Sequence, residues 1–417
     1  MTTDKTLGPV VDRGSNGVNK TTRILVVIGT RPEVIKLAPV IRKLYAESWA
    51  DTKVLLTGQH ADLALPLVKS FGISVDEHMQ VMAPNQTLAS LLSRLIEGID
   101  RALEQYKPSV VIAQGDTASV LASSLASFLR KIPFAHVEAG LRTGNIQLPF
   151  PEELNRVLTT RMTKWHFAPT PKAKENLMQE GIQEEDVWVT GNTVIDALKH
   201  TLSQDRDIVF QHADQDRDCM GGNVKDPWER VLESRRPLIL ITAHRRENFG
   251  QPLIGICRAI LELADRYSNY DFVYAVHPNP QVKGPVHQML ARKENVHLLP
   301  PADYKTFCFV LQKAKLILSD SGGVQEEAPA LGVPVLVMRD QTERPEAVSI
   351  GANRLVGTDP ERIIAAVSEL LNSPDAYACM STAGSPYGNG QASDAIVGVL
   401  RAQLAKSARD LYLQHQL

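Results

Sequence analysis

Short apolar runs alternate with helix-like patterns along most of the chain. In the first half these runs cover residues 23–28, 53–56, 109–113, 132–137, 165–168 and 187–189. After the first run, Pro32 suits the opening turn of a helix. Apolar residues then recur at helical spacing, at Val34, Leu37, Ala38, Ile41 and Leu44. Short, continuously apolar strands that alternate with helices are typical of a parallel sheet covered on both faces.

A second series of strands begins near Pro237 and covers residues 238–242, 272–276, 296–299, 316–318 and 335–338. The two series predict an α/β protein with two Rossmann-like, doubly wound domains facing a cleft. We expect a disordered extension over 1–22, a first domain over 23–198, a linker with an insertion over 199–236, and a second domain over 237–389. A final helix over about 390–417 is expected to pack back on the first domain.

Composition narrows the class of protein. The 417 residues carry a formal net charge of -2, which gives no basic surface for nucleic acid and no polybasic patch for a membrane. The four cysteines lack metal-ligand spacing, and free thiols in a reducing compartment are the expected state. Without a secretory signal or a membrane-length apolar run, we expect a cytoplasmic protein.

Polar side chains collect where strands end, which is where open parallel sheets bind ligands. Arg31 and Lys36 follow the first strand of the first domain, and Gln59 and His60 the second. In the second domain Arg245 comes just after the first strand, next to His244. The remaining strand-end candidates are Asp116, Glu138, His244, His277 and Ser321.

Several of these residues also have a purely structural interpretation. For Asp116 the structural alternative is a helix cap, and for Glu138 it is an ion pair with Arg142. Glu152 and Glu153 suit the first turn of a helix, where the dipole favours acids. We expect His136 and His166, both within apolar strands, to be core residues, and His212 to be solvated. His244 ends a strand and precedes two arginines, which favours a functional role.

The turn after residues 316–318 reads Ser321-Gly322-Gly323 and opens a helix. Glycines let backbone N–H groups approach a ligand closely, and the start of a helix favours a phosphate. Glu327 lies about one turn further on, where a carboxylate can accept hydrogen bonds from a ribose diol. This pattern predicts a nucleotide-diphosphate pocket.

Taken together, the motifs resemble those of the non-hydrolysing UDP-N-acetylglucosamine 2-epimerases. The matching segments appear in family order and span about residues 23–400: 29–36, 57–60, 115–117, 136–144, 151–156, 189–193, 242–248, 320–327 and 342–346. The resemblance implies a GT-B-like fold, a homodimer and a UDP-binding second domain. It also implies interconversion of UDP-N-acetylglucosamine and UDP-N-acetylmannosamine, with neither cofactor nor metal.

The resemblance also assigns roles. Asp116, Glu138 and Glu152 match the catalytic acids, and His244 the catalytic histidine. Arg31, Lys36, His277, Ser321, Gly322, Gly323, Glu327 and Arg344 match or accompany the substrate contacts. Gln59, His60 and Arg245 fall at an allosteric site for a second substrate molecule. Asp62 and Asn85 depart from the pattern of that site, which puts allosteric activation in doubt.

Three other functions stay open at this point. A hydrolysing 2-epimerase would release UDP and free N-acetylmannosamine. A GT-B glycosyltransferase would share the Ser-Gly-Gly helix but would need an acceptor site. A catalytically inactive sensor of nucleotide sugars would not need to retain Asp116, Glu138, Glu152 and His244 together.

Overall fold

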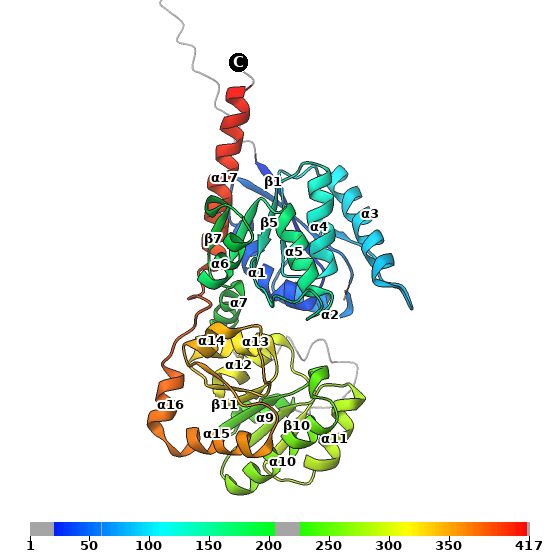
Figure 1. Ribbon diagram of the computed structural model, residues 1–417. Coiled ribbons are helices and arrows are strands. Elements are labelled where there is room, and N and C mark those ends of the chain that lie inside the picture. Colours follow the sequence, from blue (N-terminus) through cyan, green and yellow to red (C-terminus); the bar gives the residue numbers. More distant parts are fainter. Residues whose placement is uncertain (1–20, 60, 205–225, 415–417) are drawn as a thin grey trace, which may run out of the picture.

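The computed structural model describes residues 21–59, 61–204 and 226–414. Most of the predicted N-terminal extension and of the predicted insertion, together with His60 and His212, lies outside these described residues. The rest forms two α/β lobes stacked one above the other (Figure 1). No helix among the described residues is long and apolar enough to cross a bilayer.

The first lobe is built on a seven-stranded parallel sheet. Its strand order is β3-β2-β1-β4-β5-β6-β7. The strands are β1 (Thr22–Ile28), β2 (Ala50–Leu56), β3 (Glu77–His78), β4 (Val110–Gln114), β5 (Phe134–Val137), β6 (Trp165–Ala168) and β7 (Val187–Val189). The order reverses between β1 and β4, so the ends of these two strands form the switch point of the sheet.

Helices cover both faces of this sheet. In β1, Ile24 and Val26 enter one core with α1 and α7, whereas Leu25 and Val27 enter another with α3 and α4. Burial on both faces explains why the strands lack polar alternation. The helices are α1 (Arg31–Tyr45), α2 (Ala61–Ser70), α3 (Leu88–Tyr106), α4 (Ala118–Leu129), α5 (Glu152–Met162), α6 (Pro171–Gln179), α7 (Thr193–Leu202) and the 3-10 turn η1 (Glu184–Asp186).

The second lobe repeats this design with six parallel strands in the order β10-β9-β8-β11-β12-β13. The order reverses between β8 and β11. The strands are β8 (Leu238–Thr242), β9 (Asp271–Ala275), β10 (Val296–Leu299), β11 (Ala314–Ser319), β12 (Val335–Val337) and β13 (Asn353–Leu355). The strands predicted from the sequence agree with this sheet and the first, except that the short edge strands β3 and β13 were not predicted.

Helices pack on both faces of the second sheet as well. They are α9 (Pro227–Glu233), α10 (Gln251–Arg266), α11 (Pro280–Leu290), α12 (Tyr304–Lys313), α13 (Gly322–Glu327), α14 (Pro345–Ser349), α15 (Pro360–Asn372) and α16 (Pro374–Ser381), with the 3-10 turns η2 (Arg246–Asn248) and η3 (Ala328–Leu331). Helix α9 falls inside the predicted linker, and its Trp228 is buried in the core of the second lobe.

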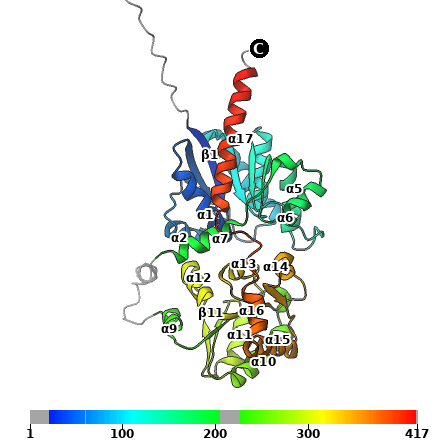
Figure 2. The same cartoon turned by 90° about the vertical axis from the view of Figure 1, so that its left-hand side faces the viewer.

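The last helix, α17 (Ala392–Gln414), returns to the first lobe and runs along it (Figure 2). It contacts α1 and α7 and buries Ile396, Val397 and Leu400. Its start is fixed by Asp196 of α7, whose Oδ1 accepts hydrogen bonds from the backbone N–H (2.8 Å) and the hydroxyl (2.6 Å) of Ser393. Helix α17 therefore completes the core of the first lobe, although it follows the second lobe in the chain.

Candidate active site

Both switch points carry predicted site residues. In the first lobe Arg31 follows β1 and Asp116 follows β4. In the second lobe His244 follows β8 and Ser321 follows β11. Because ligands of open α/β sheets bind at such points, each lobe presents one half of a candidate site.

Glu138, just after β5, has an unusual backbone. Its φ is +65°, in the left-handed region that residues other than glycine seldom adopt. Its Oε2 accepts a hydrogen bond from Asn192 Nδ2 (3.0 Å) and contacts the ammonium of Lys36. Such strain clusters at functional sites, where surrounding contacts hold it in place. The proposed ion pair with Arg142 is wrong, because Arg142 instead pairs with Glu180 (Nε to Oε1, 2.6 Å).

Helix α5 binds Asp116 and begins at Glu152. Asp116 Oδ2 accepts a hydrogen bond from Arg156 Nη2 at 2.6 Å. The helix-capping interpretation of Asp116 is wrong, because the residue before α4 is Thr117 and the carboxylate is engaged by α5. Glu152 is the first residue of α5 and half-buried. Its position in the first turn also agrees with the interpretation that the helix dipole favours an acidic residue there.

Lys36 connects the two lobes. Its Nζ contacts Glu138 of the first lobe and lies 3.2 Å from Glu326 Oε2 of the second. Burial alone would lower the pKa of Lys36, but the charges of Glu138 and Glu326 outweigh it, so the lysine stays protonated. Arg344 Nε pairs with Glu326 Oε1 at 2.7 Å. The pKa of Glu326 ends below its ordinary value, since Arg344 and Lys36 outweigh the opposing effect of burial.

Glu138 is therefore the carboxylate of this group whose proton is held more tightly. Burial raises its pKa, the charge of Lys36 opposes the rise, and the charge of Glu326 adds to it. A carboxyl group with a raised pKa is suited to general acid–base work near neutral pH.

His244 is held at the end of β8 by Asp320. The buried Oδ2 of Asp320 accepts hydrogen bonds from the backbone N–H groups of His244 and Arg245, each at 2.8 Å, and Asp320 Oδ1 lies 3.4 Å from His244 Nδ1. The His244 ring stacks on the exposed His277, with centroids 5.5 Å apart. Burial lowers the pKa of His244, only partly offset by Asp320, so the imidazole is neutral at pH 7.

The predicted phosphate turn begins α13. Ser321 is its N-cap, and Gly322 lies directly under the guanidinium of Arg344. A Cβ at Gly322 would be 2.6 Å from Arg344 Cζ, so any side chain there would have to displace the guanidinium. Glu327 ends α13, and its Oε1 accepts a hydrogen bond from the hydroxyl of Tyr304 at 2.9 Å. Burial raises the pKa of Glu327 to about 7.

The other candidates lie around this group. Arg31 is half-buried, and its charge acts on Glu327 by opposing the rise in pKa. The Gln59 side chain accepts a hydrogen bond from Ser119 Oγ at 2.9 Å. Arg245 lies 3.5 Å from Glu343 in the second lobe.

Three site residues were not predicted from the sequence: Asp320, Glu326 and Tyr304. The first two lie within the Ser-Gly-Gly motif and could have been included for that reason. Tyr304 is distant in sequence and carries no local signal, because its role depends on how α12 packs against α13.

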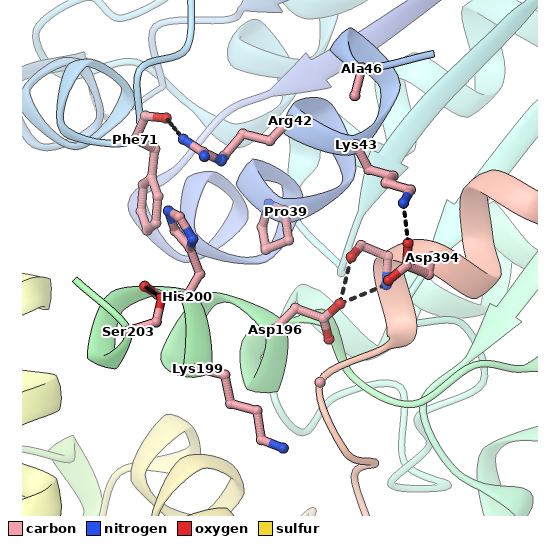
Figure 3. A pocket seen from close by; sticks show the side chains of 12 residues that line it. Pro39, Arg42, Lys43, Ala46, Phe71, Asp196, Lys199, His200, Ser203 and Asp394 are labelled. Atoms are coloured by element: carbon pink, nitrogen blue, oxygen red, sulfur yellow. Dashed lines mark hydrogen bonds and ion pairs between the residues drawn. The ribbon is translucent and has the colours of Figure 1, made fainter.

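The predicted side chains do not line the recess of about 470 Å³ that Figure 3 shows. This recess lies where α1, α7 and the start of α17 meet. Its charged groups are paired within the fold, Lys43 with Asp394 at 2.5 Å and Asp196 with Ser393. We therefore place the candidate site at the facing switch points and not in this recess.

The fold and the site together define a two-lobed nucleotide-sugar enzyme of the GT-B-like class. A solved structure described as the glycotransferase of kitacinnamycin shares this fold, with a TM-score of 0.60 at 14% identity over 92% of this chain and 99% of that one. At this identity the likeness concerns the fold alone.

Sequence comparison then gives the family. The family model for UDP-N-acetylglucosamine 2-epimerase matches residues 42–401. A protein of that name from Salmonella typhimurium is 44% identical over 380 residues, 91% of this chain and 98% of the relative. The crystal structure of the enzyme from Neisseria meningitidis bound to UDP-GlcNAc has a TM-score of 0.82 and 43% identity, covering 91% of this chain and 100% of that one. The chain belongs to the UDP-N-acetylglucosamine 2-epimerase family, which confirms the resemblance, the fold class and the enzyme class predicted from the sequence.

Proposed function

We propose that this enzyme interconverts UDP-N-acetylglucosamine and UDP-N-acetylmannosamine by elimination and re-addition of UDP. The hydrogen at carbon 2 is not acidic, so its removal needs concerted departure of the leaving group. The C2–H and C1–O bonds break, a C1=C2 double bond forms, and 2-acetamidoglucal and UDP result. Return of a proton on the other face and re-addition of UDP complete the inversion.

The main support for this proposal is the set of carboxylates in the first lobe, opposite the phosphate turn of the second. Two faces of the sugar require two acid/base groups, and Asp116, Glu138 and Glu152 supply three candidates. Lys36, protonated between Glu138 and Glu326, can stabilise a carboxylate as it changes charge.

The second lobe is proposed to bind UDP. N–H groups at the start of α13 and Arg344 would meet the diphosphate, and Glu327 the ribose diol. His244, with His277 beside it, would face the departing diphosphate. Negative charge beside an imidazole raises its pKa, so arrival of the diphosphate would favour the protonated, hydrogen-bond-donating form of His244.

Isotope exchange tests this proposal. Incubation with UDP-N-acetylglucosamine in heavy water should place deuterium at carbon 2 of both UDP-sugars, detected by mass spectrometry and NMR. Turnover without this label would reject the elimination mechanism. Stoichiometric release of free sugar with UDP would instead indicate the hydrolysing reaction, and sugar transfer to an acceptor a glycosyltransferase.

We also propose that the enzyme is cytoplasmic and that it is a homodimer. Its domain boundaries are proposed to be those expected from the sequence, except that α9 belongs to the second lobe. Phe128 and Leu129, at the end of α4, are 59% and 67% exposed, and adjacent exposed apolar residues are typical of an interaction surface. Cys257 and Cys308 are buried free thiols, which fits a reducing compartment. Light scattering of the purified protein tests the homodimer, and cell fractionation tests the cytoplasmic location.

A further inference from the structure

Helix α5 holds Asp116 by two separate groups. Arg156 Nη2 donates to the carboxylate, at 2.6 Å from Oδ2, and Asn155 Nδ2 donates to the backbone carbonyl of Asp116 at 2.8 Å. Arg156 Nη1 also donates to Glu153 Oε2 at 2.7 Å. The guanidinium therefore bridges two carboxylates, and only one of them, Asp116, is a proposed catalytic acid.

Arg156 and Glu153 are buried, and Asp116 is half-buried. Arg156 is 8% exposed and Glu153 is 1% exposed. Burial would lower the pKa of Arg156, but the two carboxylates outweigh it and the pKa is raised, so the guanidinium stays charged. A buried ion pair is weak evidence for a role in stability, because apolar residues of similar size often serve as well. A need to hold the Asp116 carboxylate in one position explains the ion pairs of Arg156 better.

Glu153 also fixes the loop that connects Glu138 to Glu152. Its Oε1 accepts hydrogen bonds from the backbone N–H groups of Thr143 (2.8 Å) and Gly144 (3.1 Å). One side chain thus anchors both this loop and Arg156.

We propose that Arg156, anchored by Glu153, is a positioning residue that sets the Asp116 carboxylate relative to Glu152 for proton transfer. This inference rests on the proposed function. A guanidinium donates to two carboxylates in a rigid planar geometry, whereas the rotatable donors of a lysine ammonium fix no such plane. Arg156 donates these hydrogen bonds to Glu153 and Asp116, neither of which is a proposed UDP contact, so its loss should affect the chemical step and not UDP binding.

The test compares three variants with wild type. We expect Arg156→Gln to lower kcat at least about 30-fold with KM changed less than about threefold, because misplacement by about 1 Å can cost 10²-fold. Arg156→Lys should recover part of kcat. Arg161→Gln is the matched control, since Arg161 lies on the same helix but is exposed and donates to the carbonyl of Glu180; its kcat should equal that of wild type.

A double variant separates positioning from folding. Glu153→Gln with Arg156→Gln removes both charges of the buried pair, so Tm should recover relative to Arg156→Gln while kcat stays low. Recovery of kcat together with Tm would overturn the proposal, as would a rise in KM at unchanged kcat in Arg156→Gln. If wild type incorporates no deuterium at carbon 2, the proposed function itself fails. If wild type incorporates it and Arg156→Gln does so at the same rate, only the positioning role fails.

Discussion

Lys36 and Glu326 form an ion pair that joins the two lobes directly beside Glu138. Lys36 Nζ lies 3.2 Å from Glu326 Oε2, and the two side chains are 10% and 1% exposed. Ring contact between Phe71 of the first lobe and Tyr304 of the second, with centroids 6.1 Å apart, adds an apolar contact nearby. The charge state around Glu138 is therefore linked to the closeness of the lobes.

Glu326→Gln should separate the lobes in the ligand-free enzyme. The change leaves Lys36 and Arg344 without their shared partner, and breaking a buried pair costs about 3–5 kcal/mol. We expect a larger radius of gyration by small-angle X-ray scattering and turnover lowered about tenfold or more. Glu343→Gln is the matched control, because Glu343 pairs with Arg339 and Arg344 within the second lobe. Equal scattering changes in both variants would contradict the role of Glu326.

Conversion of any one proposed catalytic acid to its amide should nearly abolish turnover. For Asp116→Asn, Glu138→Gln and Glu152→Gln we expect kcat to fall at least about 100-fold, the range of general acid–base contributions. UDP affinity, measured by calorimetry, should change little, because none of the three acids is a proposed UDP contact. Wild-type rates in all three variants would remove the assignment.

The affinity for UDP-N-acetylglucosamine should depend on the ionisation of Glu327. Its pKa is raised to about 7 by burial, so a falling pH converts the acceptor carboxylate to an acid. Binding of a ribose diol then requires loss of a proton, and affinity should weaken by up to tenfold per unit as pH falls below about 7. The sugar-linked diphosphate does not titrate in this range. In calorimetry, Glu327→Gln should lose this weakening toward acid pH; a decline in affinity as steep as that of wild type would exclude Glu327 as the source.

His136 should make the fold less stable in acid. It is 1% exposed, its Nε2 lies 2.7 Å from the Gly115 carbonyl oxygen, and burial lowers its pKa to about 4. Between pH 6.5 and about 4 the unfolded chain binds a proton that the folded chain does not. The free energy of unfolding therefore decreases as the pH is lowered through this range, by about 3 kcal/mol in total. Denaturant unfolding should show a weaker decline in His136→Gln. The exposed His287→Gln should retain the wild-type decline.

The strands and the positions of the polar residues could be predicted because they follow from local pattern. Continuous apolar runs identified most strands of both sheets, and the placement of Asp116, Glu138 and His244 after strands identified the site edge. Strands β3 and β13 were not predicted, since both are short and consist mostly of polar residues, Glu-His in β3 and Asn-Arg-Leu in β13. His136 and His166 are core residues, as predicted from their apolar strands.

Partners of charged residues could not be predicted in the same way. Arg142 is close to Glu138 in sequence but pairs with Glu180, whereas Glu138 contacts Lys36. Lys36 and Glu326 are distant in sequence and meet only when the lobes pack. Such contacts depend on tertiary geometry, which spacing along the chain does not encode.

The anchoring of α17 by Asp196 has a consequence for biosynthesis. Helix α17 follows the whole second lobe in the chain, yet it buries Ile396, Val397 and Leu400 against the first lobe. The core of the first lobe therefore cannot be completed until the residues after 391 have been translated. A nascent chain at that stage exposes an apolar stripe on α1 and α7, and a ribosome stalled there would present a substrate for chaperones.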